Sequence, residues 1–133
     1  MGREMDLQFS WIEHRGRLYP GCESLARDRP LSLLCDFLVD DGGLGLEHHI
    51  PWLKECIAKC EKVLREVSPT DDFTTELFAA DFGQDRTLIY PTTSDPESGQ
   101  DIQTAVFLRI VSDWLAFLER ESSAEVVTYS YRA

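Results

Sequence analysis

Apolar and polar residues alternate near the start of the chain. Residues 7–12, LQFSWI, place apolar side chains at every second position, which is the pattern of a strand with one buried face. Arg15 and Gly16 then predict a turn, and residues 17–19 predict a short return strand. The chain therefore opens with one strand or with a strand pair.

Helical spacing predicts three helices farther along. Residues 30–39, PLSLLCDFLV, are apolar around most of a helix circumference, so we expect a short, deeply buried helix with Pro30 at its first position. A second helix is expected over residues 51–67, where a proline opens a run with apolar residues every three or four positions. A third is expected over residues 102–120, with Asp101 as its N-cap.

Two other patterns predict strands. Residues 74–81 and 86–90 are rich in β-favouring residues and flank the turn FGQD, so they predict a hairpin. Residues 125–131, EVVTYSY, form a last β-favouring run. The predicted order is β(β)ααββαβ, in which strands do not alternate singly with helices. We therefore predict an α+β fold, with one mostly antiparallel sheet and three helices packed mainly on one face.

Length and composition fit one domain. The chain has 133 residues, of which 43% are hydrophobic, and a chain of this size folds without help from a metal or a disulfide. We assign residues 1–133 to a single domain and expect residues 1–5 to form a flexible tail. No apolar run approaches the roughly 20 residues of a membrane span, so no membrane partner is expected.

Acidic residues dominate the charge of the chain. The formal net charge is −11, and residues 69–133 hold twelve acidic residues but only four basic ones. A field of this sign repels nucleic acids and anionic membranes, and it attracts basic proteins. We therefore expect a basic protein as the partner and no nucleic acid.

The start of the chain predicts its compartment. The stretch MGREMDLQFSW contains no apolar signal core, so we expect a cytoplasmic protein. In the cytoplasm the four cysteines are expected to stay reduced.

The stretch HHIPWLKECIAKC, residues 48–60, raises the question of a metal site. On an ideal helix His49, Cys56 and Cys60 project along nearly one line. However, His49 and Cys60 are separated by about 16 Å of helical rise, whereas zinc needs its ligands within about 2.0–2.3 Å. Both cysteines also belong to the apolar stripe of the helix. We interpret them as core residues and predict no metal and no other cofactor.

Motifs for catalysis are scarce. Cys22 follows a YPG turn and His14 precedes it by eight residues, which makes a nucleophile–base pair conceivable. The chain contains no Gly-x-Ser-x-Gly elbow, no phosphate-binding loop and no His-Glu-x-x-His motif. We predict that the protein is not an enzyme, and a small enzyme using Cys22 with His14 stays an alternative.

Acidic residues cluster in the predicted hairpin and in the polar loop that follows it. If they converge in the fold, they form a patch suited to a basic partner, and an exposed tyrosine would add an anchor. Tyr129 and Tyr131 are further candidates for exposed aromatic residues. The predicted partner-binding residues are Asp71, Asp72, Glu76, Asp81, Asp85, Tyr90, Asp95 and Glu97.

The last predicted strand offers a different kind of contact. Residues 125–131 carry little charge, and charge is one of the usual protections of a sheet edge. If this strand lies at an edge, a partner can add a strand to it.

In size, sign of charge, acid-rich hairpin and loop, and lack of a reactive motif, the whole chain resembles the immunity proteins of bacterial toxin–immunity systems. The resemblance implies a protein that binds and neutralises a toxin, often a basic nuclease. An acidic face would speed association with such a partner and occlude its substrate-binding surface. A secretion-type chaperone or adaptor, also small and acidic but dimeric with apolar grooves, is the alternative of another class.

Overall fold

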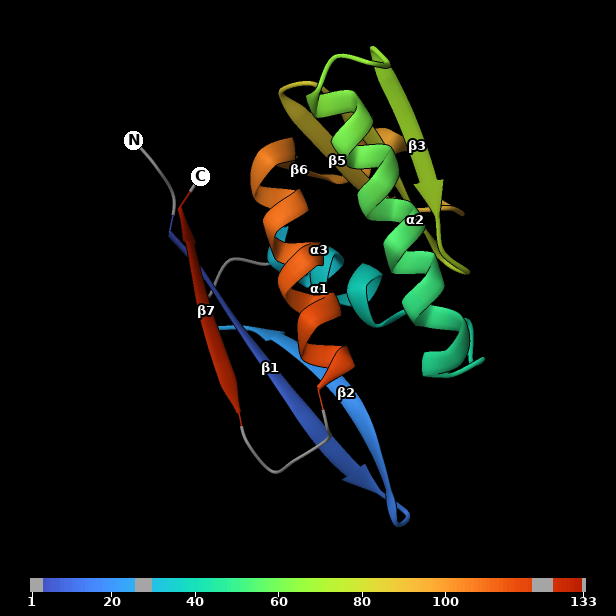
Figure 1. Ribbon diagram of the computed structural model, residues 1–133, viewed down its shortest axis with the longest axis vertical. Helices are drawn as coiled ribbons and strands as arrows, with labels where there is room; N and C mark the ends of the chain where they lie inside the picture. Colours follow the sequence, from blue (N-terminus) through green and yellow to red (C-terminus); the bar gives the residue numbers. More distant parts are fainter. Residues whose placement is uncertain (1–3, 26–29, 121–125, 133) are drawn as a thin grey trace.

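The computed structural model describes residues 4–25, 30–120 and 126–132. It has three α-helices and seven strands, the fold is of the predicted α+β class, and the predicted elements follow one another in the predicted order (Figure 1). The elements are β1 (Glu4–His14), β2 (Arg17–Ser24), α1 (Pro30–Val39), α2 (Leu46–Leu64), β3 (Thr70–Thr74), β4 (Phe78–Gly83), β5 (Arg86–Pro91), the short 3-10 helix η1 (Pro96–Ser98), β6 (Gln100–Gln103), α3 (Thr104–Glu119) and β7 (Val127–Arg132).

The strands form two antiparallel sheets, which corrects the prediction of a single sheet. One has three strands in the order β2-β1-β7, and the other has four in the order β3-β4-β5-β6. The last strand returns to the first, with Phe9 opposite Val127 and Leu7 opposite Tyr129. This pairing buries the apolar face of β1, so β7 does not extend the sheet that begins at β3.

The helices lie between the two sheets (Figure 1). Helix α1 contacts β2 of the three-stranded sheet and also β5 and β6 of the four-stranded sheet, whereas α2 packs on α3, β3 and β4. Helix α3 joins the two sides, because its Phe107 meets Phe82 of β4 while its Trp114 meets Phe9 of β1. Each sheet is thus covered by helices on one face only, as predicted.

The predicted N-terminal tail extends too far into the chain. Strand β1 begins at Glu4, and Met5 is buried opposite Tyr131, so these two residues belong to the sheet. Residues 1–3 of the predicted tail lie outside the described residues.

Two predicted helix starts are also wrong. Helix α2 begins at Leu46, five residues before Pro51, and the backbone N–H groups of His48 and His49 already donate to the carbonyl of Gly45. Asp101 does not cap α3, because it lies in β6, a strand that the sequence did not predict. Helix α3 follows this strand directly at Thr104.

An aromatic cluster occupies the centre of the core. Trp114 is fully buried, with its ring edge-to-face against Phe9 at 4.9 Å between centroids and stacked on Phe117 at 5.7 Å. Tyr131 packs on the same side of the three-stranded sheet and donates a hydrogen bond of 2.7 Å to the Asp113 carboxylate. Helix α3 is therefore held against β1 by aromatic contacts and against β7 by the hydrogen bond from Tyr131 to Asp113.

Among the described residues, no helix combines the length and the apolar character needed to cross a membrane.

Candidate functional site

The face of the four-stranded sheet that points away from the helices carries a row of carboxylates. Asp72 of β3 pairs with Asp81 of β4, Asp81 with Leu88 of β5, and Leu88 with Asp101 of β6. Residues directly opposite each other project to the same face, so these four side chains form one line across the sheet. The neighbouring row, which contains Phe73 and Ile89, is buried under the helices, so the carboxylate row points away from them.

An apolar strip accompanies this row. Leu88 and Tyr90 are two positions apart on β5, so both project to this face. Both are half-buried, whereas Asp72 and Asp101 are exposed. We call Asp72, Asp81, Leu88, Tyr90 and Asp101 the acidic sheet face. Such a surface offers a partner both carboxylates and an aromatic anchor.

Tyr90 is tied to the carboxylate row. Its hydroxyl donates a hydrogen bond of 3.1 Å to Oδ2 of Asp81. Partial loss of hydration, this hydrogen bond and the charges of Asp81 and Asp72 raise the pKa of Tyr90 above its ordinary value. Tyr90 therefore stays neutral at pH 7 and holds the Asp81 carboxylate in place.

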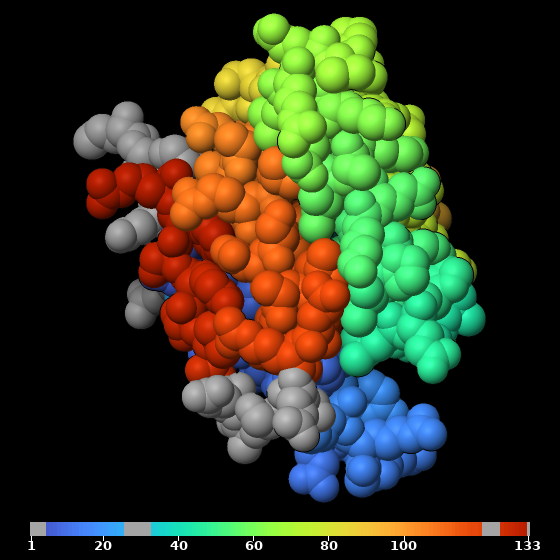
Figure 2. Space-filling view, viewed as in Figure 1, coloured from blue at the N-terminus to red at the C-terminus, as the bar shows by residue number. Residues whose placement is uncertain are grey.

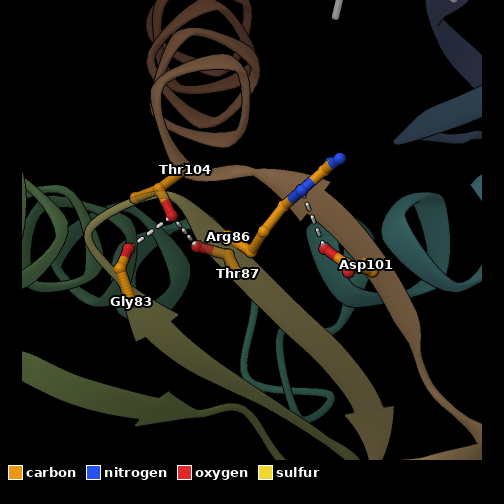
Figure 3. Close-up of polar contacts among 5 residues, drawn as sticks. All are labelled: Gly83, Arg86, Thr87, Asp101 and Thr104. Atoms are coloured by element: carbon orange, nitrogen blue, oxygen red, sulfur yellow. Dashed lines mark hydrogen bonds and ion pairs between the residues drawn. The ribbon is translucent and has the colours of Figure 1, made fainter.

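The guanidinium of Arg86 lies against this face. Nε of Arg86 is 3.7 Å from Oδ1 of Asp101, and both side chains are more than half exposed (Figure 3). An exposed pair of this kind contributes little to stability, so Asp101 stays available to a stronger cation. Asp72 and Asp81 make no ion pair among the described residues.

Two buried threonines fix the junction that carries Asp101. Thr104, the first residue of α3, donates a hydrogen bond of 2.6 Å to the Gly83 carbonyl, and its hydroxyl lies 2.8 Å from that of Thr87 (Figure 3). The Thr104 backbone N–H also donates to the carbonyl of Asp85. The start of α3 is thereby fastened to the β4–β5 turn, which keeps β6 in the sheet.

The structure brings together only some of the predicted binding residues. Asp72, Asp81 and Tyr90 share the acidic sheet face, and Asp101 joins them because it is a strand residue rather than a cap. Asp71 belongs to the row of Phe82 and Thr87 and is therefore on the opposite side of the sheet. The remaining predicted residues are exposed in connections, with Asp85 in the β4–β5 turn, Glu76 in the β3–β4 loop, and Asp95 and Glu97 between β5 and β6.

Asp40 organises the loop end of the four-stranded sheet, which the sequence did not reveal. One oxygen of its carboxylate accepts hydrogen bonds of 2.7 Å from the Thr75 hydroxyl and from the Leu77 backbone N–H. The other oxygen accepts from the backbone N–H of Gly42. These contacts attach the α1–α2 loop to the β3–β4 loop, so we assign Asp40 a structural role.

The β1–β2 hairpin has the opposite chemistry to the acidic sheet face. It projects from the body of the molecule, at the far end from β3 and β5 (Figures 1 and 2). Ile12, Leu18 and Tyr19 are each about half exposed on it, beside exposed Arg15 and Arg17 at the turn. The hairpin thus presents two arginines and an exposed Glu13 beside its apolar side chains, whereas the carboxylate row lies on the other sheet.

The Cys22–His14 pair is ruled out by the strand register. Cys22 is opposite Phe9 and His14 is opposite Arg17, so five residues of β1, about 17 Å, separate the two side chains. Cys22 lies next to Cys35 of α1 instead. The hydrogen bond with Cys35 and burial raise the pKa of Cys22 well above its ordinary value, so little thiolate is present at neutral pH, which opposes a role as a catalytic nucleophile there.

The histidine and cysteine residues of α2 lie in the core. Cys56 and Cys60 are fully buried, as predicted, and His49 is buried as well. Nε2 of His49 lies 2.8 Å from the Leu38 carbonyl and 3.5 Å from Nε1 of Trp114; the shorter contact identifies Nε2 as the protonated nitrogen, which donates to Leu38. Within residues 4–25, 30–120 and 126–132, no group of three or more potential metal ligands comes together.

The buried His49 predicts a loss of stability in acid. Burial lowers its pKa below the ordinary 6.5, more than the Leu38 hydrogen bond and nearby acids raise it. The unfolded chain therefore takes up a proton below about pH 6.5 while the folded protein does not, and stability falls by at most about 1.4 kcal/mol per pH unit. The free energy of unfolding is measured with urea at pH 7.5 and at pH 5.5. Between these two pH values it should fall less in His49→Gln than in the exposed control His14→Gln. Equal losses would contradict this account.

Strand β7 lies at the edge of its sheet, which was the condition for strand addition. The Leu25 N–H donates to the Asp6 carbonyl, so the backbone N–H and C=O groups of Asp6 face β2. Those of its neighbour Leu7 therefore face β7, where they pair with Tyr129. It follows that the backbone groups of Thr128 and Ser130 point outward. Of the two further candidates for exposed aromatic residues, Tyr129 is half-buried, as Tyr90 is, and Tyr131 is 2% exposed against α3.

Comparisons of this chain with protein-family models, with curated proteins and with solved structures gave no significant match.

The carboxylate row has a measurable cost in stability. Asp72 and Asp81 are directly opposite each other, and like charges in that position destabilise a sheet by several tenths of a kcal/mol. We expect Asp72→Asn to raise the free energy of unfolding by about 0.5 kcal/mol at low salt and by less at high salt. Asp101→Asn is the matched control, because Asp101 faces Leu88 and Arg86. An Asp72 variant no more stable than the Asp101 variant would contradict the repulsion.

Proposed function

We propose that this protein is an acidic binding module that neutralises a basic protein partner through the acidic sheet face. In biological terms, we propose an immunity protein that inhibits a bacterial toxin of the nuclease type. The observation that carries the proposal is the row of Asp72, Asp81 and Asp101 on the sheet face opposite the one on which the helices pack. Two of these carboxylates repel each other in the free protein, and a cation from a partner relieves that repulsion.

The chemistry of this face explains how inhibition would work. Lysine or arginine side chains of the partner would bind the carboxylates, arginine in a two-pronged geometry, while Leu88 and Tyr90 would cover an apolar part of its surface. A nuclease uses such cations to hold phosphate groups, so their capture blocks substrate binding.

An immobilised sample of the full chain, exposed to native lysate of its source organism, tests this function. We expect one basic protein to be retained at low salt and released at high salt. The purified partner should then lose nuclease activity when an equimolar amount of this chain is added. Full activity at equimolar or higher amounts would overturn the inhibitory role.

The free edge of β7 favours an adaptor as the second candidate function. An adaptor would take a partner strand along the outward backbone groups of Thr128 and Ser130. Proline at an outward-facing edge position removes a donor without breaking the sheet, so Thr128→Pro should fold and lose strand addition. Tyr129→Pro is the contrasting variant, because it removes an N–H that faces β1. If partner binding through the acidic sheet face is correct, Thr128→Pro binds the partner with unchanged affinity.

A further inference from the structure

Two cysteines from different elements are in contact inside the molecule. Sγ of Cys22, on β2, lies 3.0 Å from Sγ of Cys35, on α1. Cys22 is half-buried and Cys35 is 5% exposed, and both are free thiols. A disulfide requires about 2.05 Å between the sulfur atoms, so an approach of about 1 Å would suffice to join them.

We propose that Cys22 and Cys35 form an intramolecular disulfide when a small-molecule or protein disulfide oxidises them. The thiolate of Cys22 attacks one sulfur of the oxidant, which forms a mixed disulfide and releases one thiol. The thiolate of Cys35 then attacks the Cys22 sulfur and displaces the second thiol. Each protein thiol gives up a proton, the pair gives up two electrons, and the oxidant is reduced to two thiols.

Exposure determines the order of these two steps. Cys22 lies on an edge strand and is the more accessible of the pair, so it meets the oxidant first. Cys35 is held beside it by helix α1 and is almost inaccessible to an oxidant in solution. The raised pKa of Cys22 keeps its thiolate scarce at neutral pH, so the oxidation should accelerate as the pH rises.

The other two cysteines provide an internal control. Cys56 and Cys60 lie one turn apart on α2 and are fully buried, and the Cys60 thiol contacts the Thr104 carbonyl at 4.0 Å. Burial raises the pKa of Cys60 to about 12 and that of Cys56 well above its ordinary value. Both should stay reduced under conditions that oxidise the first pair.

The proposed disulfide would connect the two sheets through a helix. Strand β2 belongs to the three-stranded sheet, and α1 also packs on β5 and β6 of the four-stranded sheet. The bond would also join two residues thirteen positions apart in the unfolded chain, and the loss of chain entropy there stabilises the folded state. The melting temperature should rise by roughly 10 °C on oxidation. This inference does not depend on the proposed function.

Mass spectrometry of the reduced full chain, treated with oxidised glutathione, tests the proposal. After denaturation and alkylation, we expect two thiols labelled instead of four, an unlabelled mass lower by two hydrogen atoms, and a peptide that links residues 22 and 35. Dithiothreitol should reverse the change. Four labelled thiols, or a linkage that includes Cys56 or Cys60, would overturn the proposal.

Serine variants separate the two steps of the reaction. Cys35→Ser should stop at the mixed disulfide and retain one glutathione on Cys22, whereas Cys22→Ser should retain three unmodified thiols. A variant with Cys56→Ser and Cys60→Ser should form the same bond as the wild-type protein. If that variant does not fold, the labelling pattern of the wild-type protein still decides the question.

Discussion

Replacing Asp72, Asp81 and Asp101 together with asparagine is expected to weaken binding of the basic partner about 100-fold, or about 2.8 kcal/mol. The three carboxylates form one row on the sheet face that points away from the helices, so a docked cationic surface would contact all of them. Asparagine keeps the size of each side chain and removes only its charge. The affinity is measured by calorimetry at low and high salt, and the salt dependence should decrease along with the affinity.

A second triple variant separates contact from net charge. Asp85→Asn, Asp95→Asn and Glu97→Gln remove the same three charges, but from connections outside the acidic sheet face. This variant should bind within a few-fold of the wild-type protein, because it loses only long-range attraction. Equal weakening by the two variants would mean that overall charge, and not this face, governs binding.

Replacing Trp114 with alanine is expected to reduce the free energy of unfolding by about 3–5 kcal/mol, which is the usual cost of deleting a buried aromatic side chain. Trp114 is fully buried between Phe9 and Phe117, and its indole nitrogen lies 3.5 Å from His49. Small domains are stabilised by about 5–15 kcal/mol in total, so the variant should be close to unfolding at room temperature. Urea denaturation followed by circular dichroism measures the loss.

Trp52→Ala is the matched control for this prediction. Trp52 is half-buried on α2 and contacts His48 edge-to-face at 4.3 Å. Its removal opens no enclosed cavity, so a loss of about 1–2 kcal/mol is expected. If the two variants lose equal stability, Trp114 does not hold the centre of the core.

The helices and the first strand could be predicted because their burial follows a local period. Cys56 and Cys60 fall on the apolar stripe of α2, and Leu7 and Phe9 alternate with polar residues in β1. The start of α2 was misplaced because a proline usually marks the first turn, whereas Pro51 lies inside this helix.

Strand partners could not be predicted, because pairing depends on which distant segments share a core. Nothing local indicates that β7 pairs with β1 and not with the hairpin that follows α2. The same limit applies to the candidate site, since Asp72 and Asp101 face one side only through the register of four strands. Strand β6 was hidden because its four residues adjoin the apolar pattern of α3.

Chemical labelling of carboxylates, with and without the captured partner, tests most directly whether the acidic sheet face is the contact surface. Carbodiimide coupling to an amine, followed by mass spectrometry, reports the accessibility of each acidic side chain. We predict that the partner protects Asp72, Asp81 and Asp101 from labelling and leaves Asp85, Asp95 and Glu97 as reactive as in the free protein. If the partner instead protects Asp85, Asp95 and Glu97 and leaves the three carboxylates of the acidic sheet face fully labelled, the assignment of this face is contradicted.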